Sequence, residues 1–197
     1  AKLMLKHKTK KHDIEMAYTY KKEHISENSV EYEMRDSAGY SVPHNGKELY
    51  MIYSMRANNT LDANRMEAYL QDTYRFTSKG GHTHFTLNYG VRMSHWSFNK
   101  ETIVSPRVSL GIIPAYSENT TFRFAAGLYY QAPFFKELRD TSTVNGITYA
   151  NLNEKIKSPR SIHFIAGYDY RFRINNLRYR FSAEAYYKAL GNFIPYS

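Results

Sequence analysis

Apolar and polar side chains alternate with a period of two along most of this chain, most regularly between Ile162 and Ala189. Apolar residues occupy the even positions from 162 to 174 and then the odd positions from 177 to 189. The parity changes at Asn175-Asn176, and asparagine tolerates the positive φ angles of a tight primed turn. Because a period of two indicates strands, this stretch predicts an antiparallel hairpin.

The same alternation recurs in shorter stretches along the chain. Apolar residues alternate with polar or small ones over residues 14–20, 85–93, 108–112 and 122–130. The stretch from Met66 to Phe76 fits less cleanly, because Asp72 falls on its apolar parity. A β-bulge or an interfacial position would explain that exception.

The connections between these predicted strands are unequal in length. Short connections are predicted at residues 8–11, 78–81, 117–120 and 175–176. Long loops are predicted over residues 25–61 and 132–158, with a shorter connection at 99–101 on the same side. Inside the first loop, residues 32–53 are a candidate for a hairpin of their own. Short and long connections alternate along about eight strands, which is typical of outer-membrane barrels with periplasmic turns and extracellular loops.

The tyrosine content favours a membrane location for these strands. Aromatic residues make up 16% of the chain, and 19 residues are tyrosines, which suit membrane interfaces because the ring contacts lipid while the hydroxyl stays wet. No run approaches the ~18 apolar residues of a transmembrane helix, whereas a transmembrane strand needs only about 9–11 residues. The sequence therefore predicts an all-β, antiparallel, up-and-down transmembrane β-barrel. A soluble β-sandwich also alternates, but it has no reason to gather aromatic residues at strand ends.

The two parities predict two different faces. The lipid-facing aromatic girdle near the short turns is predicted to consist of Tyr74, Phe76, Phe122, Phe124, Tyr170, Phe172, Tyr179 and Phe181. The lumen-facing set is predicted to be Arg92, Arg107, Arg123, Gln131, Asp169, Arg171, Arg173, Arg178, Arg180 and Glu184. As a group the second set indicates a polar lumen. Each of its members either contacts a plug, guides an anionic substrate, or is paired within a solvated interior.

Charge and composition exclude several other kinds of site. The net charge of +9 is spread through the strands, which argues against a single basic patch for nucleic acid. Cysteine is absent, so disulfides and thiolate metal sites are excluded. His82 and His84 share a strand face without an evident third ligand, which favours a structural role over metal binding. No metal ion or cofactor is predicted.

No sequence motif of a known hydrolase or phosphate-binding loop is present, so no catalytic residue is predicted. A barrel hydrolase of the outer membrane would need a histidine with an Asp or Ser partner at the extracellular rim. His95 and Asp140 are the candidates, but nothing in the sequence places them together. The loop tyrosines are candidates either for a substrate site or for packing within the loops: Tyr40, Tyr50, Tyr53 and Tyr149.

Several motifs, in a fixed order, resemble the barrel of TonB-dependent receptors. They are Tyr89-Gly90-Val91-Arg92, then Ser105-Pro106-Arg107, then the strand end from Phe122 to Pro133. Tyr69-Leu70-Gln71-Asp72 is similar to a Y-x-Q-D strand of that family, and Glu184 to Lys188 with Ile194-Pro195-Tyr196 is similar to its E-x-Y-Y-K…iPY segment. Each motif alone is weak, but their order from about Glu67 onward is fairly specific.

The resemblance implies active import of a scarce nutrient across the bacterial outer membrane, such as a ferric siderophore, haem, cobalamin or an oligosaccharide. It also implies a barrel of about 22 strands, an N-terminal plug and energy coupling through TonB. The implied partners are outer-membrane lipid and lipopolysaccharide, the plug and remaining strands, the TonB complex and the substrate.

This chain shows no signal peptide, plug or TonB box, and about eight strands fall short of that barrel. Residues 1–197 are therefore expected to be one internal segment of a larger receptor. The alternatives are a complete eight-stranded barrel with an anchoring or adhesive role and, third, the barrel hydrolase.

Overall fold

The computed structural model describes residues 1–35 and 50–192 of the chain. Strands account for most of these residues, and within them no α-helix occurs. The elements are β1 (Lys2–Lys8), β2 (His12–Arg35), β3 (Tyr50–Thr77), β4 (His84–Trp96), β5 (Glu101–Ile113), β6 (Thr120–Tyr130), the 3₁₀ turn η1 (Phe135–Leu138), β7 (Arg139–Val144), β8 (Ile147–Leu152), β9 (Arg160–Ile174) and β10 (Leu177–Gly191).

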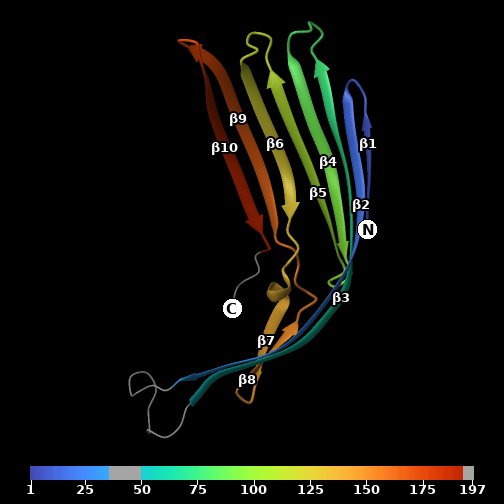
Figure 1. Cartoon of the computed structure of the whole chain (residues 1–197), viewed down its shortest axis with the longest axis vertical. Helices are drawn as coiled ribbons and strands as arrows, with labels where there is room; N and C mark the ends of the chain where they lie inside the picture. The colour runs from blue at the N-terminus through green and yellow to red at the C-terminus, as the bar shows by residue number, and fades with distance from the viewer. Residues whose placement is uncertain (36–49, 193–197) are drawn as a thin grey trace.

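Eight of these strands lie side by side in the order β1-β2-β3-β4-β5-β6-β9-β10 (Figure 1). Every neighbouring pair on this path is antiparallel. The prediction of an all-β, up-and-down sheet of about eight strands is therefore confirmed. In the described part of the chain β1 and β10 are opposite edges that do not pair, so the sheet is open. The alternative of a complete eight-stranded barrel needs that pairing and is contradicted by the strand order.

The four predicted short connections lie together at one edge of the sheet, and the β4–β5 connection and residues 131–159 lie toward the opposite edge (Figure 1). Asn175 and Asn176 have φ angles of 48° and 63°, the left-handed values that a primed turn requires. Pairing continues directly from this turn, with Ile174 opposite Leu177. The predicted hairpin is thus confirmed, and the predicted short connections share one edge of the sheet.

The first predicted long loop, residues 25–61, is mostly strand. β2 and β3 stay paired from His12 and Tyr74 as far as Arg35 and Tyr50, so residues 32–35 and 50–53 continue this hairpin and do not start a separate one. Residues 36–49 lie outside the described residues. The sequence loses its alternation beyond Lys22, but backbone pairing needs only N–H and C=O groups, so the strands continue where the side-chain pattern ends.

The second predicted long loop, residues 132–158, is a folded segment. It contains η1 and the β7–β8 hairpin, and β8 pairs in parallel with β3, with Met55 opposite Thr148 and Ala57 opposite Ala150. This parallel contact is absent from the predicted up-and-down topology. Figure 1 shows β7 and β8 beside the far half of the β2–β3 hairpin.

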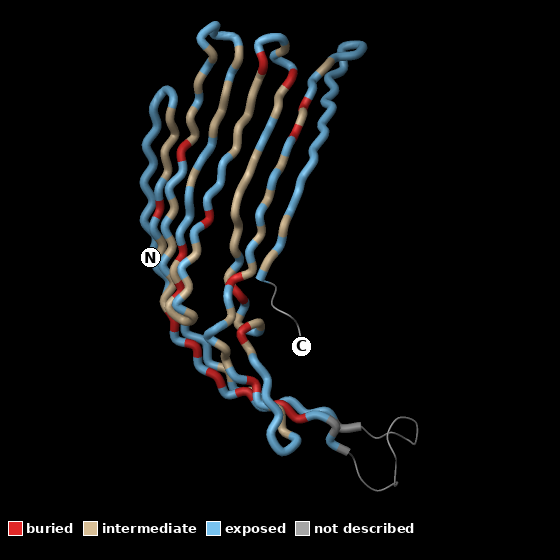
Figure 2. The backbone as a smooth tube through the Cα atoms, turned by 180° about the vertical axis from the view of Figure 1, so that it is seen from behind, coloured by how far each residue is buried: buried red, intermediate tan, exposed pale blue. Residues whose placement is uncertain are grey.

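The sheet has two faces of opposite character. We call the face on which residues 132–158 dock the inner face; it carries Glu15 and Asp169, whereas the outer face carries Met16, Leu70 and Phe124. The three outer-face side chains are 44%, 48% and 47% exposed. Figure 2 shows that buried residues gather in the long hairpin and are sparse in the strands near the short turns. In the part of the sheet near the short turns, the apolar side chains of the outer face are therefore exposed and not enclosed in a core.

Among the described residues, no helix has both the length and the apolar composition needed to cross a membrane.

Asp72, the exception to the alternation, lies on the outer face and is only 7% exposed. Its Oδ2 lies 2.6 Å from His12 Nδ1 and accepts a hydrogen bond from the Tyr89 hydroxyl at 2.9 Å. Its Oδ1 accepts a hydrogen bond from the Asp13 backbone N–H at 3.2 Å. Pairing passes through Asp72 without a register shift, so the bulge explanation is wrong. A polar network, satisfied from three strands, accounts for this residue.

Candidate functional site: the inner face and its loop-side groove

The eight aromatic residues predicted to face lipid all lie on the outer face. Near the short turns they form ladders: Tyr74 stacks on Phe76 at 5.0 Å between ring centroids, and Phe172 stacks on Tyr170 and Tyr179 at 5.7 and 5.5 Å. Stacked rings of this kind add to strand pairing beyond the area that they bury. Their common face is a structural fact, and their contact with lipid stays a prediction.

Nine of the ten residues predicted to face the lumen stand on the opposite, inner face, on β4, β5, β6, β9 and β10. Gln131 follows directly after β6, where its backbone N–H donates to the Pro159 carbonyl oxygen at 3.1 Å. The structure therefore brings the polar set onto one face, while the existence of a lumen on that side stays a prediction.

Asp169 is the centre of the polar network on this face, and it is 5% exposed. Arg123 approaches its Oδ2 at 2.9 Å, and Arg180 and Ser182 each donate to its Oδ1 at 2.7 Å. A Cβ at Gly167 would lie 3.4 Å from the Arg123 guanidinium, so glycine leaves room for that side chain to lie along the sheet. Two of the predicted arginines are thus held by one carboxylate.

Other inner-face residues are held by smaller contacts. Arg92 Nη2 lies 2.6 Å from Glu67 Oε2. The Arg107 guanidinium lies 4.3 Å from the centroid of the Tyr129 ring, which in turn packs against His163 at 4.6 Å. Such cation–π contacts favour arginine over a partly desolvated ring. The inner face is therefore an organised polar wall with positioned side chains.

On β2 and β3 the two faces exchange their character part of the way along the hairpin. Near the short turns the outer face is apolar, as at Met16 and Leu70, but farther along the same face carries the pair His24 and Asp62, whose Nδ1 and Oδ1 are 2.6 Å apart. The inner face changes the other way, from Glu15 to a fully buried Leu61. The exchange marks the boundary between two surroundings of one continuous strand pair.

The apolar inner face of the far half is covered by residues 132–158. Leu138 is fully buried against Leu61, Ala63 and Trp96. Arg139 forms an ion pair with Glu27. The Asn59 side chain donates to the Ala150 carbonyl oxygen at 3.0 Å, beside a second buried cluster of Met55, Ala57 and Ala150. These contacts hold residues 132–158 as a fixed platform on the long hairpin.

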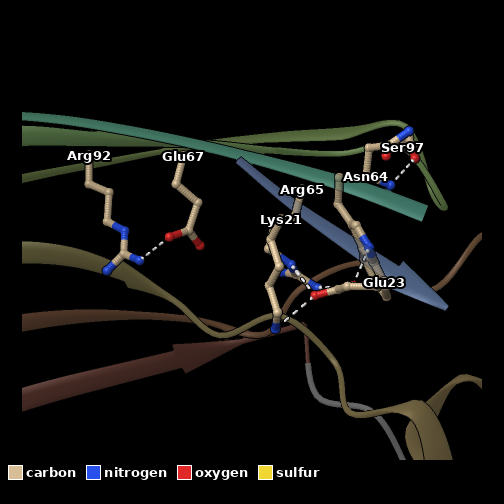
Figure 3. A network of polar contacts seen from close by, with 8 residues as sticks. Lys21, Glu23, Asn64, Arg65, Glu67, Arg92 and Ser97 are labelled. Atoms are coloured by element: carbon tan, nitrogen blue, oxygen red, sulfur yellow. Dashed lines mark hydrogen bonds and ion pairs between the residues drawn. The ribbon is translucent and has the colours of Figure 1, made fainter. Parts of the chain in front are cut away.

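A groove of about 610 Å³ lies where the polar wall meets this platform. Figure 3 shows Lys21, Glu23 and Arg65 pointing toward one another at this position. Lys21 Nζ and Arg65 Nε each lie 3.2 Å from Glu23 Oε1. The other lining residues are Lys22, His24, Ile25, Leu61, Glu67, Trp96, Ala132, Pro133, Phe134, Phe135 and Leu138.

Glu23 organises the floor of this groove. The Trp96 indole N–H donates to its Oε2 at 3.1 Å, and the Arg65 guanidinium lies 4.4 Å from the Trp96 ring centroid. Burial favours the neutral form of Glu23, but hydrogen bonds and charge from Arg65 and Lys21 outweigh it, so its pKa lies below the usual value. A fixed carboxylate, two cations and an aromatic edge can recognise a polar ligand that has both charged and apolar parts.

The other candidates from the sequence do not converge on a site. In the described residues no group of three or more His, Cys, Asp or Glu side chains is placed to hold a metal ion. His95 Nδ1 lies 2.9 Å from Thr102 Oγ1, whereas Asp140 accepts from the Asn153 side chain at 3.4 Å, so the proposed hydrolase pair has separate partners. Among the loop tyrosines, Tyr149 lies on β8 and Tyr53 on β3, and Tyr40 lies outside the described residues.

Sequence reasoning missed the groove. Lys21 and Glu23 follow Tyr20, the last residue of the first apolar outer-face run of β2, and Arg65 and Glu67 flank Met66 on the paired strand. Charges at every second position directly beyond an apolar run were the available signal. Their convergence with Trp96 depends on the pairing of β3 with β4, which a single strand does not reveal.

The sheet is open and antiparallel, with an exposed aromatic outer face and a polar inner face. Short turns lie at one edge and a folded long loop lies at the other. This arrangement is typical of the wall of a transmembrane β-barrel. The sequence model of the family described as "TonB dependent receptor-like, beta-barrel" matches residues 6–196. The chain belongs to this family of outer-membrane receptors. A search among curated proteins found no match.

Proposed function

We propose that this chain forms part of the barrel wall of a TonB-dependent receptor that binds a scarce nutrient outside the cell and imports it through the outer membrane. The candidate nutrients are a ferric siderophore, haem, cobalamin or an oligosaccharide. The short-turn edge faces the periplasm and the long-hairpin edge faces the exterior. The other partners are lipid and lipopolysaccharide, a plug domain, further barrel strands and the TonB complex.

The observation that carries this proposal is the exchange of faces along β2 and β3, together with the family membership. A strand pair that is apolar outside near Leu70 and polar outside near His24 has lipid around one half and water around the other. The folded platform beyond the exchange then stands outside the membrane. Loops on a rigid scaffold are where such proteins place recognition.

Within this receptor the groove floored by Glu23 is the proposed first contact for the nutrient. It lies on the inner face, beyond the exchange of faces, and opens beside the exposed ring of Phe134, which is 63% exposed. At the end of the groove toward the short turns, Glu67 forms an ion pair with Arg92, which a ligand leaving the groove meets next (Figure 3). The polar wall thus continues from the groove toward the periplasmic edge.

Growth of a deletion strain on defined iron, haem, cobalamin and glycan sources tests the proposal. A defect confined to one nutrient class, rescued by the wild-type gene, supports import and names the substrate class. Rescue by Glu23→Ala is expected to be poorer than rescue by Glu31→Ala, a matched change on the same strand and face outside the groove. Unchanged growth and unchanged uptake of every labelled nutrient contradict import.

A barrel hydrolase is the remaining alternative, and no contact in the described residues favours it. Loss of hydrolysis of a lipid or ester substrate on substitution of His95 would be the result that revives it.

A further inference from the structure

The Glu23 carboxylate on the floor of the groove has its accepting positions filled by protein donors. A carboxylate accepts at about four lone-pair positions, two on each oxygen. Arg65 Nε and Lys21 Nζ each lie 3.2 Å from Oε1, and Arg65 Nη2 and Trp96 Nε1 donate to Oε2 at 3.5 and 3.1 Å. The Glu23 side chain is only 14% exposed. Glu23 therefore holds its neighbours in place and leaves no accepting position to a ligand.

Lys21 is the charged group of this cluster that a ligand can reach. Its side chain is 66% exposed, against 15% for that of Arg65, whose guanidinium lies over the Trp96 ring. An ammonium group carries three N–H donors, and among the described residues one of them is directed to Glu23. Lys21 and Arg65 stand directly opposite each other in the β2–β3 ladder, where like charges repel. One carboxylate thus balances two cations, and the remaining positive charge lies on an open ammonium group.

The rest of the groove adds apolar surface beside this ammonium group. Phe134 and Ile25 belong to the lining and are 63% and 38% exposed. Glu67, the second carboxylate of the lining, lies at the end toward the short turns, where its Oε2 is 2.6 Å from Arg92 Nη2. An open cation next to an exposed ring and an aliphatic side chain suits a charged oxygen group that is attached to an apolar skeleton.

We propose that the groove selects organic anions, in which carboxylates or similar charged oxygen groups adjoin an apolar ring or chain, and that Lys21 determines this specificity. The inference rests on the proposed function and narrows its nutrient classes. A sugar hydroxyl both donates and accepts hydrogen bonds, so an uncharged oligosaccharide needs acceptors in the site, and Glu23 supplies none. An uncharged ligand also leaves the charge of Lys21 without a partner, which is costly once the ligand excludes water. Haem, through its propionates, and negatively charged ferric siderophores fit this chemistry.

Nutrient uptake by cells that carry the full-length receptor tests the proposal, after uptake by a deletion strain is subtracted. Two labelled probes are organic anions: haem and a ferric triscatecholate. Four carry no net negative charge: haem dimethyl ester, an uncharged ferric trihydroxamate, cobalamin and an uncharged linear oligosaccharide. Haem dimethyl ester keeps the apolar ring of haem and blocks its carboxylates, so the two probes differ in the groups that Lys21 is proposed to bind.

The expected result is uptake of haem or of the ferric triscatecholate in preference to all four other probes, and which of the two is taken up identifies the source of the anion. Lys21→Gln should raise the half-saturating concentration of that probe about tenfold, while the maximal rate and the amount of receptor in the membrane stay the same. Lys21→Arg keeps the charge and should retain wild-type uptake. Lys79→Gln removes the same charge from a turn at the short-turn edge and is the matched control.

Preferred uptake of the oligosaccharide, of cobalamin or of another probe without net negative charge would overturn the specificity and leave the proposed import intact. A half-saturating concentration that Lys21→Gln changes no more than Lys79→Gln does would overturn the role of Lys21. Uptake of none of the six probes by the wild-type receptor would contradict the proposed function itself. The failure of this inference and the failure of the proposed function are therefore distinguishable.

Discussion

The two halves of the β2–β3 hairpin belong to the same two strands in one ladder, yet they carry their apolar side chains on opposite faces. Near the short turns Leu70 is 48% exposed on the outer face, while Glu15 lies on the inner face and forms an ion pair with Lys6, with 3.0 Å between Oε2 and Nζ. Beyond the exchange of faces Leu61 is 1% exposed on the inner face, while His24 and Asp62 pair on the outer face. The backbone pairing of β2 with β3 continues unchanged through this exchange. In each half the apolar face marks the side that packed protein covers, as at Leu61, or that we expect lipid to cover, as at Leu70.

The largest expected effect comes from the half that carries the platform. Leu138→Ala removes a fully buried side chain from the cluster with Leu61 and Trp96, which costs about 2–5 kcal/mol. We expect faster hydrogen exchange across β7 and β8 while the amides of β4 and β5 stay protected. Val144→Ala on the same hairpin, where the side chain is 56% exposed, is the control. Equal protection in both variants would show that the platform does not depend on this cluster.

The apolar half responds to charge on its outer face. Leu70→Arg is expected to cost about 2–4 kcal/mol, because the proposed function places Leu70 in a lipid-facing band, where an arginine loses its hydration. Thr60→Arg is the matched control, since Thr60 lies on the same strand and face but beyond the exchange. Unfolding by urea in lipid vesicles measures both. Equal costs at the two positions would contradict the assignment of lipid to one half alone.

Asp72 tests how the apolar face tolerates a polar centre. Asp72→Ala leaves the Tyr89 hydroxyl, the Asp13 N–H and His12 without their shared acceptor, so we expect a loss of about 1–3 kcal/mol. Thr73→Ala, which removes one hydrogen bond to Asn88, should cost less. Thermal unfolding of the two variants side by side gives the comparison. A stabilised Asp72→Ala variant would show that lipid prefers an apolar residue there.

The smallest effect concerns the pH dependence of the groove. A carboxyl group whose pKa is lowered on folding stabilises the fold above its unfolded value, about 4.3, and that contribution disappears as pH falls through the folded value. Glu23 is such a group, and Trp96, the one tryptophan in the chain, donates to it. Trp96 fluorescence is therefore expected to change as the medium is acidified through this range. In Glu23→Gln the change should vanish, and an unaltered titration would exclude Glu23 as its cause.

Much of the fold follows from short-range patterns. The alternation of residues 162–174 and 177–189, with two asparagines between them, is enough to place β9 and β10 and the parity of every side chain on them. The same reasoning put nine of the ten polar residues on one face. A hydrophobic period of two indicates a strand, because the side chains of a strand point alternately to its two sides.

The candidate site was harder to predict. Glu23, Arg65 and Trp96 come from β2, β3 and β4, and they meet only because the register of three strands aligns them. The end predicted for the strand at Ile25 was wrong because the backbone of β2 stays paired with β3 beyond the point where the alternation of its side chains ends. Leu138 lies more than 70 residues from Leu61 in the sequence, and no local rule connects them.

The sequence by itself determined the strands, their turns and which side chains share a face, because these depend on the two-residue period and on turn chemistry. The tertiary structure alone decided how far β2 and β3 extend, how residues 132–158 dock on them, and which charges meet at the groove. Those features depend on register and on contacts between distant segments. Such contacts are set by the joint burial of side chains such as Leu61 and Leu138, and only the folded chain brings them together.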